Sequence, residues 1–384
     1  NKEKIVLDQV VSVSPNTNLE LGGGKKYNTH SRIPKEKIIF YSHHLCHASH
    51  SFYSSNFDAS LIITIDDAGL DSDGKEISLG LYYGKNNKIV KILEQNKGIT
   101  GFSLGTLWTK CTRFIFKLSA GYPRGHQAGS VMAMAAFGDP EKYYKDFYRM
   151  ATDDRLQILI PPPGMIRGWV EPEDDVIHPY LNKYRLIAEK SEQEKMNLAA
   201  SLQKVTEDII WNFIKQGIAY IKKNPDNFDQ NSIKNLCLSG GVSLNSVMTG
   251  KIKSVFSDTI ENVFVPPVPY DGGLNIGACQ YHYHHVLGKP RIKNLFVSPY
   301  LGETYTDNDV KTAIDNNNTK IKIQNNISID RIVDYMLEEK IISIFQGKSE
   351  SGRRALGNRS IVADPRSKNM KDLINKKVKN SLKN

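Results

Sequence analysis

The amino-acid sequence predicts an α/β protein with more than one lobe. Short β-branched runs that are typical of buried strands alternate with segments whose apolar residues recur at helical spacing. The 384 residues suffice for one large core or two ordinary ones. Hydrophobic residues make up 40% of the chain and charged residues 24%, as in ordinary globular proteins, so we expect a packed fold.

The predicted strands begin after residue 37. Residues 38–41 form an apolar run long enough for a short strand, and Leu61–Ile65 forms a second run that stops at Asp66. Two further apolar runs, residues 80–83 and 89–93, flank a turn, which predicts a hairpin. From Glu194 to Lys222 the apolar residues keep helical spacing, so we expect a long amphipathic helix that packs on a sheet.

After this helix the chain returns to short elements. Leu236–Leu238 and Asn262–Val265 have the composition of strands, and Ser243–Lys251 between them is helix-like. Beyond Pro290 the chain turns polar and rich in Asn, until Ile329–Phe345 predicts a new helix and strand. We therefore expect a first lobe over residues 1–325 and a second domain over residues 326–384.

Composition excludes several classes of protein. The longest apolar runs are far short of the roughly 20 residues that a membrane span needs, so no membrane partner is expected. The four cysteines form no CxxC pair, which argues against a disulfide framework and favours the reducing cytoplasm. The first residues carry no initiator Met and no signal pattern, so we expect the chain to begin within a longer protein. A net charge of +10 suits anionic ligands such as nucleotides, or nucleic acid.

Two histidines form the sharpest local feature. His43 and His47 are spaced i, i+4 and lie on one face if the segment is helical, so they can share a metal ion. Asp66 and Asp271 lie near predicted strand ends, where open α/β sheets place ligands. Two imidazoles with two carboxylates suit Fe, Mn or Zn better than Ca or Mg. The alternatives are a polar surface loop for the histidines and turn or helix caps for the aspartates.

Two other histidines are candidates for accepting a proton from an attacking hydroxyl group. His44 lies between the two predicted ligands, and His126 follows a turn-rich segment. The alternative for each is an ordinary hydrogen-bonded or exposed histidine.

A glycine turn between a strand and a helix predicts a nucleotide contact. Glycines allow the backbone to approach a ligand, and a helix N-terminus favours negative charge. An ordinary tight turn is the alternative, and no GxxxxGK[ST] motif is present. The candidate contacts are Gly240, Gly241, Val242 and Asn245.

An arginine-rich segment near the end of the chain predicts an anion site. Arg forks bind phosphate through two hydrogen bonds, and the interspersed glycines let the main chain close around an anion. A solvated basic stretch is the alternative, but the arginines alternate with small and apolar residues rather than with other charges. The segment comprises Gln346–Lys348 and Gly352–Arg366.

Taken in their order along the chain, these motifs resemble those of the O-carbamoyltransferase family of the nodulation protein U and tobramycin O-carbamoyltransferase type. The resemblance covers most of the chain from about residue 38 onward and is most specific in the last motif. The segments that carry it are His43–Ala48, Thr64–Asp66, Leu238–Asn245, Asp271–Gly273 and Gly352–Arg366.

The resemblance implies a fold, a reaction and a site. It implies a lobe of the actin-like ATPase superfold, similar to the tRNA threonylcarbamoyl transferase and lacking its N-terminal part, followed by an incomplete YrdC-like domain. In such enzymes the YrdC-like domain makes carbamoyl-adenylate from ATP and carbamoyl phosphate, and the metal-bearing lobe holds this intermediate while an acceptor hydroxyl attacks. By motif, Fe(2+) or another divalent transition metal would be bound by His43, His47, Asp66 and Asp271. The turn at Gly240 and Gly241 would hold the adenosine, and Arg354, Asn358 and Arg359 would line the anion site.

Other classes of function fit less of the sequence. A metalloprotease of the HExxH type needs a Glu where His44 stands. A non-catalytic nucleotide-binding protein of the actin-like ATPase class would explain the glycine turn without the metal set. Nucleic acid is expected only as a substrate, because no recognised binding motif is present. The acceptor hydroxyl, on a small molecule or a modified nucleoside, and the oligomeric state are not determined by the sequence.

Overall fold

The computed structural model describes residues 12–15, 38–71, 74–96, 103–118, 127–152, 179–291, 298–316, 324, 326–353 and 355–379. The chain divides into two compact units, Asn1–Val297 and Ser298–Asn384. The predicted division near residue 325 falls inside the second unit.

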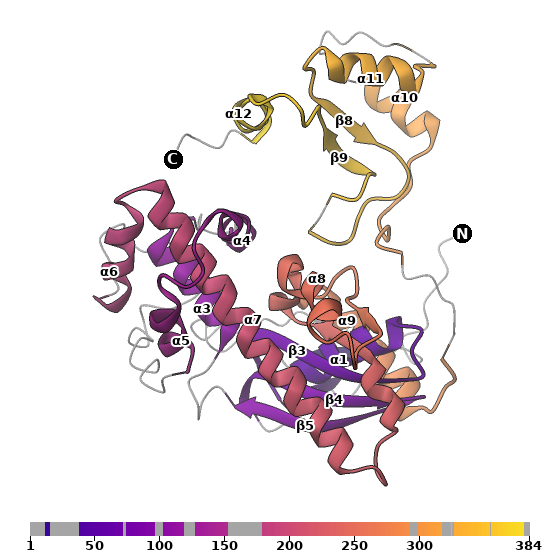
Figure 1. Ribbon diagram of the computed structural model, residues 1–384. Coiled ribbons are helices and arrows are strands. Elements are labelled where there is room, and N and C mark those ends of the chain that lie inside the picture. Colours follow the sequence, from indigo (N-terminus) through magenta and orange to yellow (C-terminus); the bar gives the residue numbers. More distant parts are fainter. Residues whose placement is uncertain are drawn as a thin grey trace. The chain divides into compact units, whose positions relative to one another are not determined.

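A five-stranded mixed sheet forms the centre of the first unit (Figure 1). Its strand order is β5-β4-β3-β6-β7. β3 (Ala59–Leu70) pairs antiparallel with β4 (Glu76–Lys85) and parallel with β6 (Asn235–Ser239). β5 (Lys88–Asn96) completes the predicted hairpin with β4, and β7 (Asn262–Phe264) pairs parallel with β6. The α/β class is therefore confirmed, as are the strands and the hairpin that the sequence predicts.

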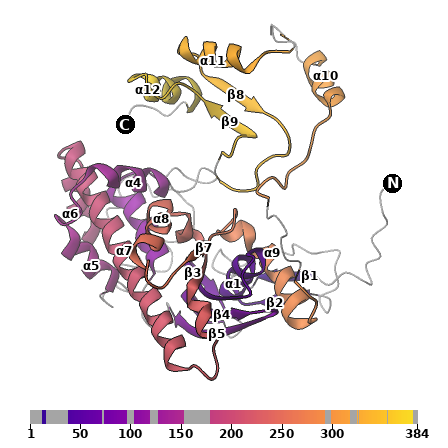
Figure 2. The same ribbon diagram turned by 45° about the vertical axis from the view of Figure 1, so that its right-hand side comes forward.

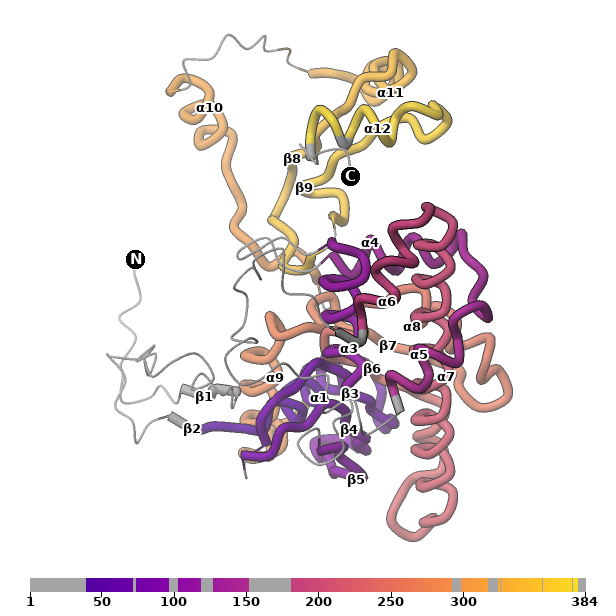
Figure 3. The backbone as a smooth tube through the Cα atoms, turned by 90° about the vertical axis from the view of Figure 1, so that its left-hand side faces the viewer, coloured from indigo at the N-terminus to yellow at the C-terminus, as the bar shows by residue number. Residues whose placement is uncertain are grey.

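Helices cover both faces of this sheet because β3 is apolar on both sides. Leu61, Ile63 and Ile65 pack into the large core that includes α7 (Glu192–Lys223), whereas Ile62 packs with α1 (His43–Ser54). Side chains alternate between the faces of a strand, so these helices lie on opposite sides of the sheet, as Figure 3 shows. The long helix predicted over residues 194–222 is confirmed.

The remaining elements of the first unit are short. α4 (Ala128–Met134), α5 (Tyr144–Thr152) and α6 (Pro179–Ala188) gather around one end of α7 (Figure 2). β1 (Ser12–Pro15) pairs in parallel with β2 (Ile38–Tyr41). The helices are α3 (Leu104–Lys110), α4 (Ala128–Met134), α5 (Tyr144–Thr152), α6 (Pro179–Ala188), α8 (Ser246–Val255) and α9 (Leu274–Gln280), with π-helical turns at Cys111–Ile115 and Tyr281–Val286 and 3-10 turns at Ala135–Phe137, Gln230–Lys234, Gly241–Leu244 and Asp271–Gly273.

Two predicted element ends differ from the structure. β3 does not stop at Asp66 but continues to Leu70, because a register shift between Ile65 and Gly69 keeps it paired with β4 beyond an irregularity. The helix expected from Ser243 begins at Ser246 instead. Asn245 ends the preceding turn and caps α8, since its side chain accepts a hydrogen bond from the backbone N–H of Met248 at 3.0 Å.

The second unit contains a helix pair and a two-stranded sheet. α10 (Asp307–Asp315) begins with a capping box formed by Thr306 and Asp309. α11 (Ile329–Leu337) precedes β8 (Ile342–Phe345), which confirms the helix and strand predicted there. β8 pairs antiparallel with β9 (Arg359–Val362), and α12 (Met370–Ile374) continues into a π-helical turn at Asn375–Lys379.

Two further expectations concern the cysteines and membrane-spanning helices. All four cysteines are described, and all are free thiols. None of the described helices combines the length and apolar character of a membrane span.

A close contact between α1 and α9 holds the helix that carries the histidine pair. The Cβ atom of an alanine at Gly277 would lie 1.9 Å from the backbone oxygen of Cys46. Only glycine therefore lets α9 approach α1 this closely.

We predict that Gly277→Ala lowers the free energy of unfolding by about 1–3 kcal/mol, because the added methyl group has to push two helices apart. Gly250→Ala is the matched control. Gly250 lies in α8, and its Cβ would meet no atom within 4 Å, so the same change should be neutral or stabilise by about 0.5–1 kcal/mol. Urea unfolding followed by circular dichroism measures both. Equal stability of the two variants would contradict the close packing of α9 on α1.

Candidate metal centre

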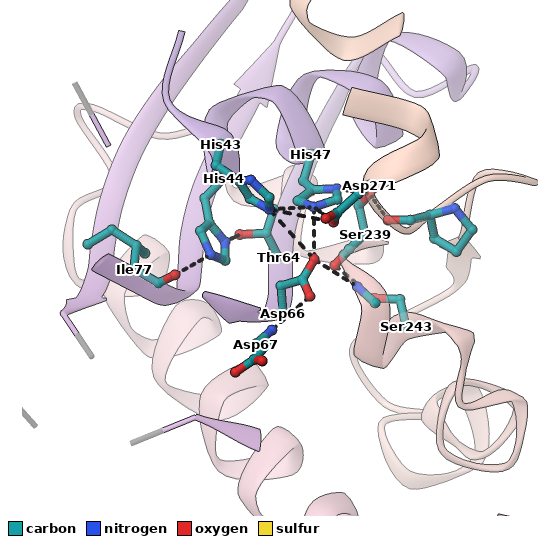
Figure 4. A network of polar contacts seen from close by, with 12 residues as sticks. His43, His44, His47, Thr64, Asp66, Asp67, Ile77, Ser239, Ser243 and Asp271 are labelled. Carbon is teal, nitrogen blue, oxygen red and sulfur yellow. Dashed lines mark hydrogen bonds and ion pairs between the residues drawn. The ribbon is translucent and has the colours of Figure 1, made fainter. Parts of the chain in front are cut away.

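Four side chains converge beside β3, the middle strand of the central sheet (Figure 4). His43 and His47 are one turn apart on α1, Asp66 lies on β3, and Asp271 begins the 3-10 turn before α9. One ligand atom from each residue lies within 4.8 Å of the others. The structure thus brings together all four residues that the sequence predicts as metal ligands.

The spacing of these atoms fits a single small cation. The Nε2 atoms of His43 and His47 are 3.1 Å apart, and Nε2 of His47 is 3.0 Å from Oδ2 of Asp66. Both Nε2 atoms lie 3.6–3.7 Å from Oδ1 of Asp271. Four donors placed tetrahedrally at about 2.1 Å from one ion would be about 3.4 Å apart. Two imidazole nitrogens and two carboxylate oxygens form a donor set that suits Fe, Mn or Zn.

The four side chains of the site differ in burial, and their charges affect one another. His43 and His47 are buried, the Asp66 side chain is 14% exposed, and the Asp271 side chain is 65% exposed. Burial alone would lower the pKa of His47, but hydrogen bonds and charges from Asp271 and Asp66 raise it to about 9. Burial alone would raise the pKa of Asp66, but His43 and His47 hold it well below its usual range. The site therefore favours positive charge and is open on the side of Asp271.

Backbone N–H groups fix the Asp66 carboxylate. Its Oδ1 accepts a hydrogen bond from the N–H of Asp67 at 2.7 Å, and its Oδ2 accepts one from the N–H of Gly241 at 3.1 Å. Asp67 is in turn held by Thr106, whose hydroxyl donates to its carboxylate, and by Ser103, whose hydroxyl donates to its backbone oxygen at 2.6 Å. No sequence pattern predicts these contacts, since Ser103 and Thr106 belong to a segment without any motif.

A glycine on β3 makes room for the His43 ring. The Cβ of an alanine at Gly69 would lie 2.1–2.4 Å from atoms of His43. A glycine inside a strand often marks such a close approach, which is the one sequence signal that could have pointed to this position.

His44 lies behind the ligands. It is fully buried, its Nε2 donates to the backbone oxygen of Ile77 at 2.7 Å, and its Nδ1 accepts from the Thr64 hydroxyl at 2.8 Å. Burial, with the neighbouring histidines, lowers the pKa of His44 to about 3. These contacts fit a role in holding α1 against the sheet better than the predicted role as proton acceptor. The other candidate, His126, lies outside the described residues.

The residues predicted to bind a nucleotide separate into two pairs. Gly240 and Gly241 lie against the metal donors, where an alanine Cβ at Gly240 would be 2.1 Å from the backbone oxygen of Ile65. The side chains of Val242 and Asn245 instead point into the protein. Val242 belongs to the large core, and Asn245 caps α8 and exchanges hydrogen bonds with Gln203.

The arginine-rich segment is held by its own hydrogen bonds. The Arg359 guanidinium donates to the backbone oxygens of Gln346 and Gly347 and lies 3.6 Å from the centre of the Phe345 ring. The Asn358 side chain donates to the backbone oxygen of Lys348 at 2.7 Å. Two of the three predicted anion contacts, Asn358 and Arg359, thus donate hydrogen bonds to backbone oxygens of the same segment. The third, Arg354, lies outside the described residues.

The loop between β8 and β9 binds a carboxylate, that of Glu350. Its Oε1 accepts hydrogen bonds from the backbone N–H groups of Leu356, Asn358 and Arg359 at 2.9–3.0 Å. These bonds, led by that of Arg359, lower the pKa of Glu350 to about 2. Glu350 was not among the residues that the sequence motifs indicate.

Comparison with models of protein families gives two matches. Residues 11–280 match the carbamoyltransferase N-terminus, and residues 333–382 match the carbamoyltransferase C-terminus. The chain belongs to the carbamoyltransferase family. The resemblance that the motifs indicate is therefore confirmed at the level of the family.

Several nodulation proteins are similar to this carbamoyltransferase chain. The chain is 28% identical to the nodulation protein NolNO of Sinorhizobium fredii over 98% of its own length and 51% of the relative's. It is 28% identical to the nodulation protein NolO of Bradyrhizobium diazoefficiens over 88% of the chain and 56% of that protein. Nodulation protein U of Rhizobium fredii is 30% identical over 37% of the chain and 22% of that protein. The chain spans about half the length of the first two relatives.

Among solved structures, HypF of T. kodakarensis has 14% sequence identity and a TM-score of 0.38, with 65% of this carbamoyltransferase chain and 37% of HypF covered. A full-length HypF in a phosphate- and nucleotide-bound form has 15% identity and a TM-score of 0.36, over 72% of the chain and 39% of HypF.

We predict that the purified protein binds one Fe, Mn or Zn ion per chain and that His47→Ala abolishes this binding, because one of four donors is lost. His282→Ala is the control, since His282 contacts Tyr41 and lies outside the cluster. Elemental analysis after loading with each metal gives the stoichiometry. A metal-free wild-type protein, or unchanged metal content in the His47 variant, would refute the site.

A second prediction concerns pH and the loop around Glu350. Because its folded-state pKa lies below the value of an unfolded Glu, its contribution to loop stability is present above about pH 4.5 and is lost as pH falls toward 2. The amide NMR signals of Leu356, Asn358 and Arg359 should therefore move together with a midpoint near 2, and Glu350→Gln should abolish that transition. A midpoint near 4.5 would show that these bonds do not form.

Proposed function

We propose that this chain forms the carbamoyl-transferring part of an O-carbamoyltransferase, which moves a carbamoyl group from carbamoyl-adenylate to an acceptor hydroxyl. The observation that carries the proposal is the convergence of His43, His47, Asp66 and Asp271, which is open on one side. Because Asp271 is exposed, an ion held by these donors would be accessible to substrate, and Fe or Mn can take ligands beyond the four that the protein offers. Family membership supports carbamoyl transfer as the reaction class.

In this proposal ATP and carbamoyl phosphate are the co-substrates from which carbamoyl-adenylate is made. The acceptor is a hydroxyl group on a small molecule or a modified nucleoside. The first unit then corresponds to a lobe of the actin-like ATPase superfold and the second to part of a YrdC-like domain. We place the reaction in the cytoplasm, where thiols such as the four free cysteines remain reduced.

The transfer step forms one bond to the carbamoyl carbon and breaks another. The acceptor oxygen bonds to this carbon, the bond from the carbon to the adenylate phosphate oxygen breaks, and AMP leaves with the electron pair. A divalent transition metal bound by the four donors would supply positive charge for that phosphate. His126 remains our prediction for the group that accepts the hydroxyl proton, because both ring nitrogens of His44 are engaged.

The residues of the chain hold the donor groups in position and shield them from water. His43 and His47 are buried, which keeps water from the inner side of the donors. The Asp66 carboxylate is held by two backbone N–H groups, so it needs no rearrangement when charge develops nearby. A non-catalytic nucleotide-binding protein would have no use for four converging donors, which favours the enzyme over this alternative.

We expect the two half-reactions to separate by mutation. Given pre-formed carbamoyl-adenylate and a panel of hydroxyl compounds, the wild-type protein should release AMP and form a carbamate ester. His47→Ala should lower this rate by more than about 100-fold, since losing a ligand should cost at least as much as losing a group that orients one. Arg354→Ala should retain transfer from the supplied intermediate but lose consumption of ATP with carbamoyl phosphate.

The control is His282→Ala, which should behave as the wild type in both assays. Chromatography of AMP and mass spectrometry of the acceptor give the readout. If His47→Ala and Arg354→Ala respond alike to supplied carbamoyl-adenylate, the division of labour between two sites is wrong.

A further inference from the structure

The turn Ser239–Gly241, at the end of β6, contacts α1, β3 and the segment just before Asp271, and so reaches all three parts of the chain that carry the metal donors. From the sequence, its glycines are predicted to contact a nucleotide. In the structure its groups are directed at His47, Asp66 and the segment before Asp271.

The contact with His47 fixes which ring nitrogen faces the other donors. The Ser239 hydroxyl donates to the backbone oxygen of Pro269 at 3.0 Å, so its lone pairs face Nδ1 of His47 at 3.3 Å. Nδ1 therefore carries a hydrogen and donates it to Ser239, which leaves Nε2 as the nitrogen that can bind an ion. Ser239 and His47 are both fully buried, so water does not compete for this bond.

The backbone of the turn contacts Asp66 directly and contacts the segment just before Asp271. The N–H of Gly241 donates to Oδ2 of Asp66, the oxygen that faces the histidines. The N–H of Gly240 donates to the backbone oxygen of Pro269 at 2.6 Å, two residues before Asp271. Gly240 has a φ of 95°, which favours glycine, and this conformation lets the turn lie directly against β3.

The other histidine lacks such a contact. Nδ1 of His43 is buried and has no hydrogen-bond partner among the described residues. His43 is held by packing against Gly69, whereas the orientation of His47 is set by a hydrogen bond. The two imidazoles are therefore not equivalent, and His47 is the anchored one.

We propose that Ser239 is a positioning residue for the metal centre, which holds His47 in the tautomer and orientation that bind the ion. The turn Ser239–Gly241 then serves to align the donors, in addition to any contact with a nucleotide. This inference rests on the proposed metal site, and it goes beyond that site in assigning a role to a residue that does not touch the ion.

The test is the affinity of the purified protein for Zn²⁺, measured by competition with a chelating dye. Ser239→Ala should weaken binding about 10–100-fold, as is typical when a group that orients a metal ligand is removed. Ser51→Ala should bind as the wild type does, because Ser51 is a buried serine of α1 whose hydroxyl donates to the backbone oxygen of Ala48.

A spectroscopic readout separates positioning from a general loss of structure. In the Zn²⁺-loaded wild type, the Nδ1 proton of His47 should be protected from exchange and visible by NMR, and in Ser239→Ala it should disappear while the unfolding midpoint of the metal-free protein stays close to that of the wild type. Should Ser239→Ala fail to fold, Ser239→Thr and Ser239→Val give a pair that differs only in the hydroxyl group. Thr should bind Zn²⁺ at least about 10-fold more tightly than Val.

The outcomes distinguish this inference from the proposed function. A wild type that binds none of Fe, Mn and Zn overturns both. A wild type that binds Zn²⁺ with no loss in Ser239→Ala, or a Thr and Val pair of equal affinity, overturns only the role of Ser239.

Discussion

The carboxylate of Asp66 is the interaction on which the rest of the centre depends. It lies 3.0 Å from His47 of α1, accepts the N–H of Gly241 from the end of β6, and is fixed by the N–H of its neighbour Asp67. One side chain on β3 thus joins α1 to the end of β6, which lies 175 positions further along the chain. It can do so because β3 has a register shift between Ile65 and Gly69, so Asp66 lies where regular pairing with β4 is interrupted.

The cost of this arrangement is electrostatic. Two imidazole nitrogens face each other 3.1 Å apart in a buried site, and two carboxylates lie beside them. Burying such groups without a partner is unfavourable, and a shared proton compensates only in part. A bound cation would compensate more completely, and its binding would then be coupled to the folding of this region. Glycines permit the approach, since Gly69, Gly240 and Gly277 all lie where a methyl group would overlap neighbouring atoms.

The two units are stabilised differently. All three buried apolar clusters of the described residues lie in the first unit. In the second unit large apolar side chains such as Ile329 and Phe345 are exposed. The arginine-rich segment is held by hydrogen bonds. The Glu350 carboxylate there accepts hydrogen bonds from three backbone N–H groups of the segment that the sequence predicts as an anion site. An internal carboxylate thus takes these N–H groups, and the binding of an external anion by the segment stays a prediction.

The sequence by itself determined what depends on neighbours along the chain. Apolar runs predicted the strands around Leu61–Ile65 and Leu236–Leu238, helical spacing predicted α7, and the spacing of His43 and His47 predicted a shared helix face. The order of motifs also indicated the carbamoyltransferase family.

Only the tertiary structure decided which distant residues meet. It placed Asp271 beside the histidines, turned His44 away from them, and brought Ser239 to His47, although 192 positions separate the last two. Periodicity reports which face of an element is buried, but it contains no information on strand register or on the direction of a hydroxyl group. Those are set by packing and hydrogen bonding between elements, which exist only once the sheet and its helices have assembled.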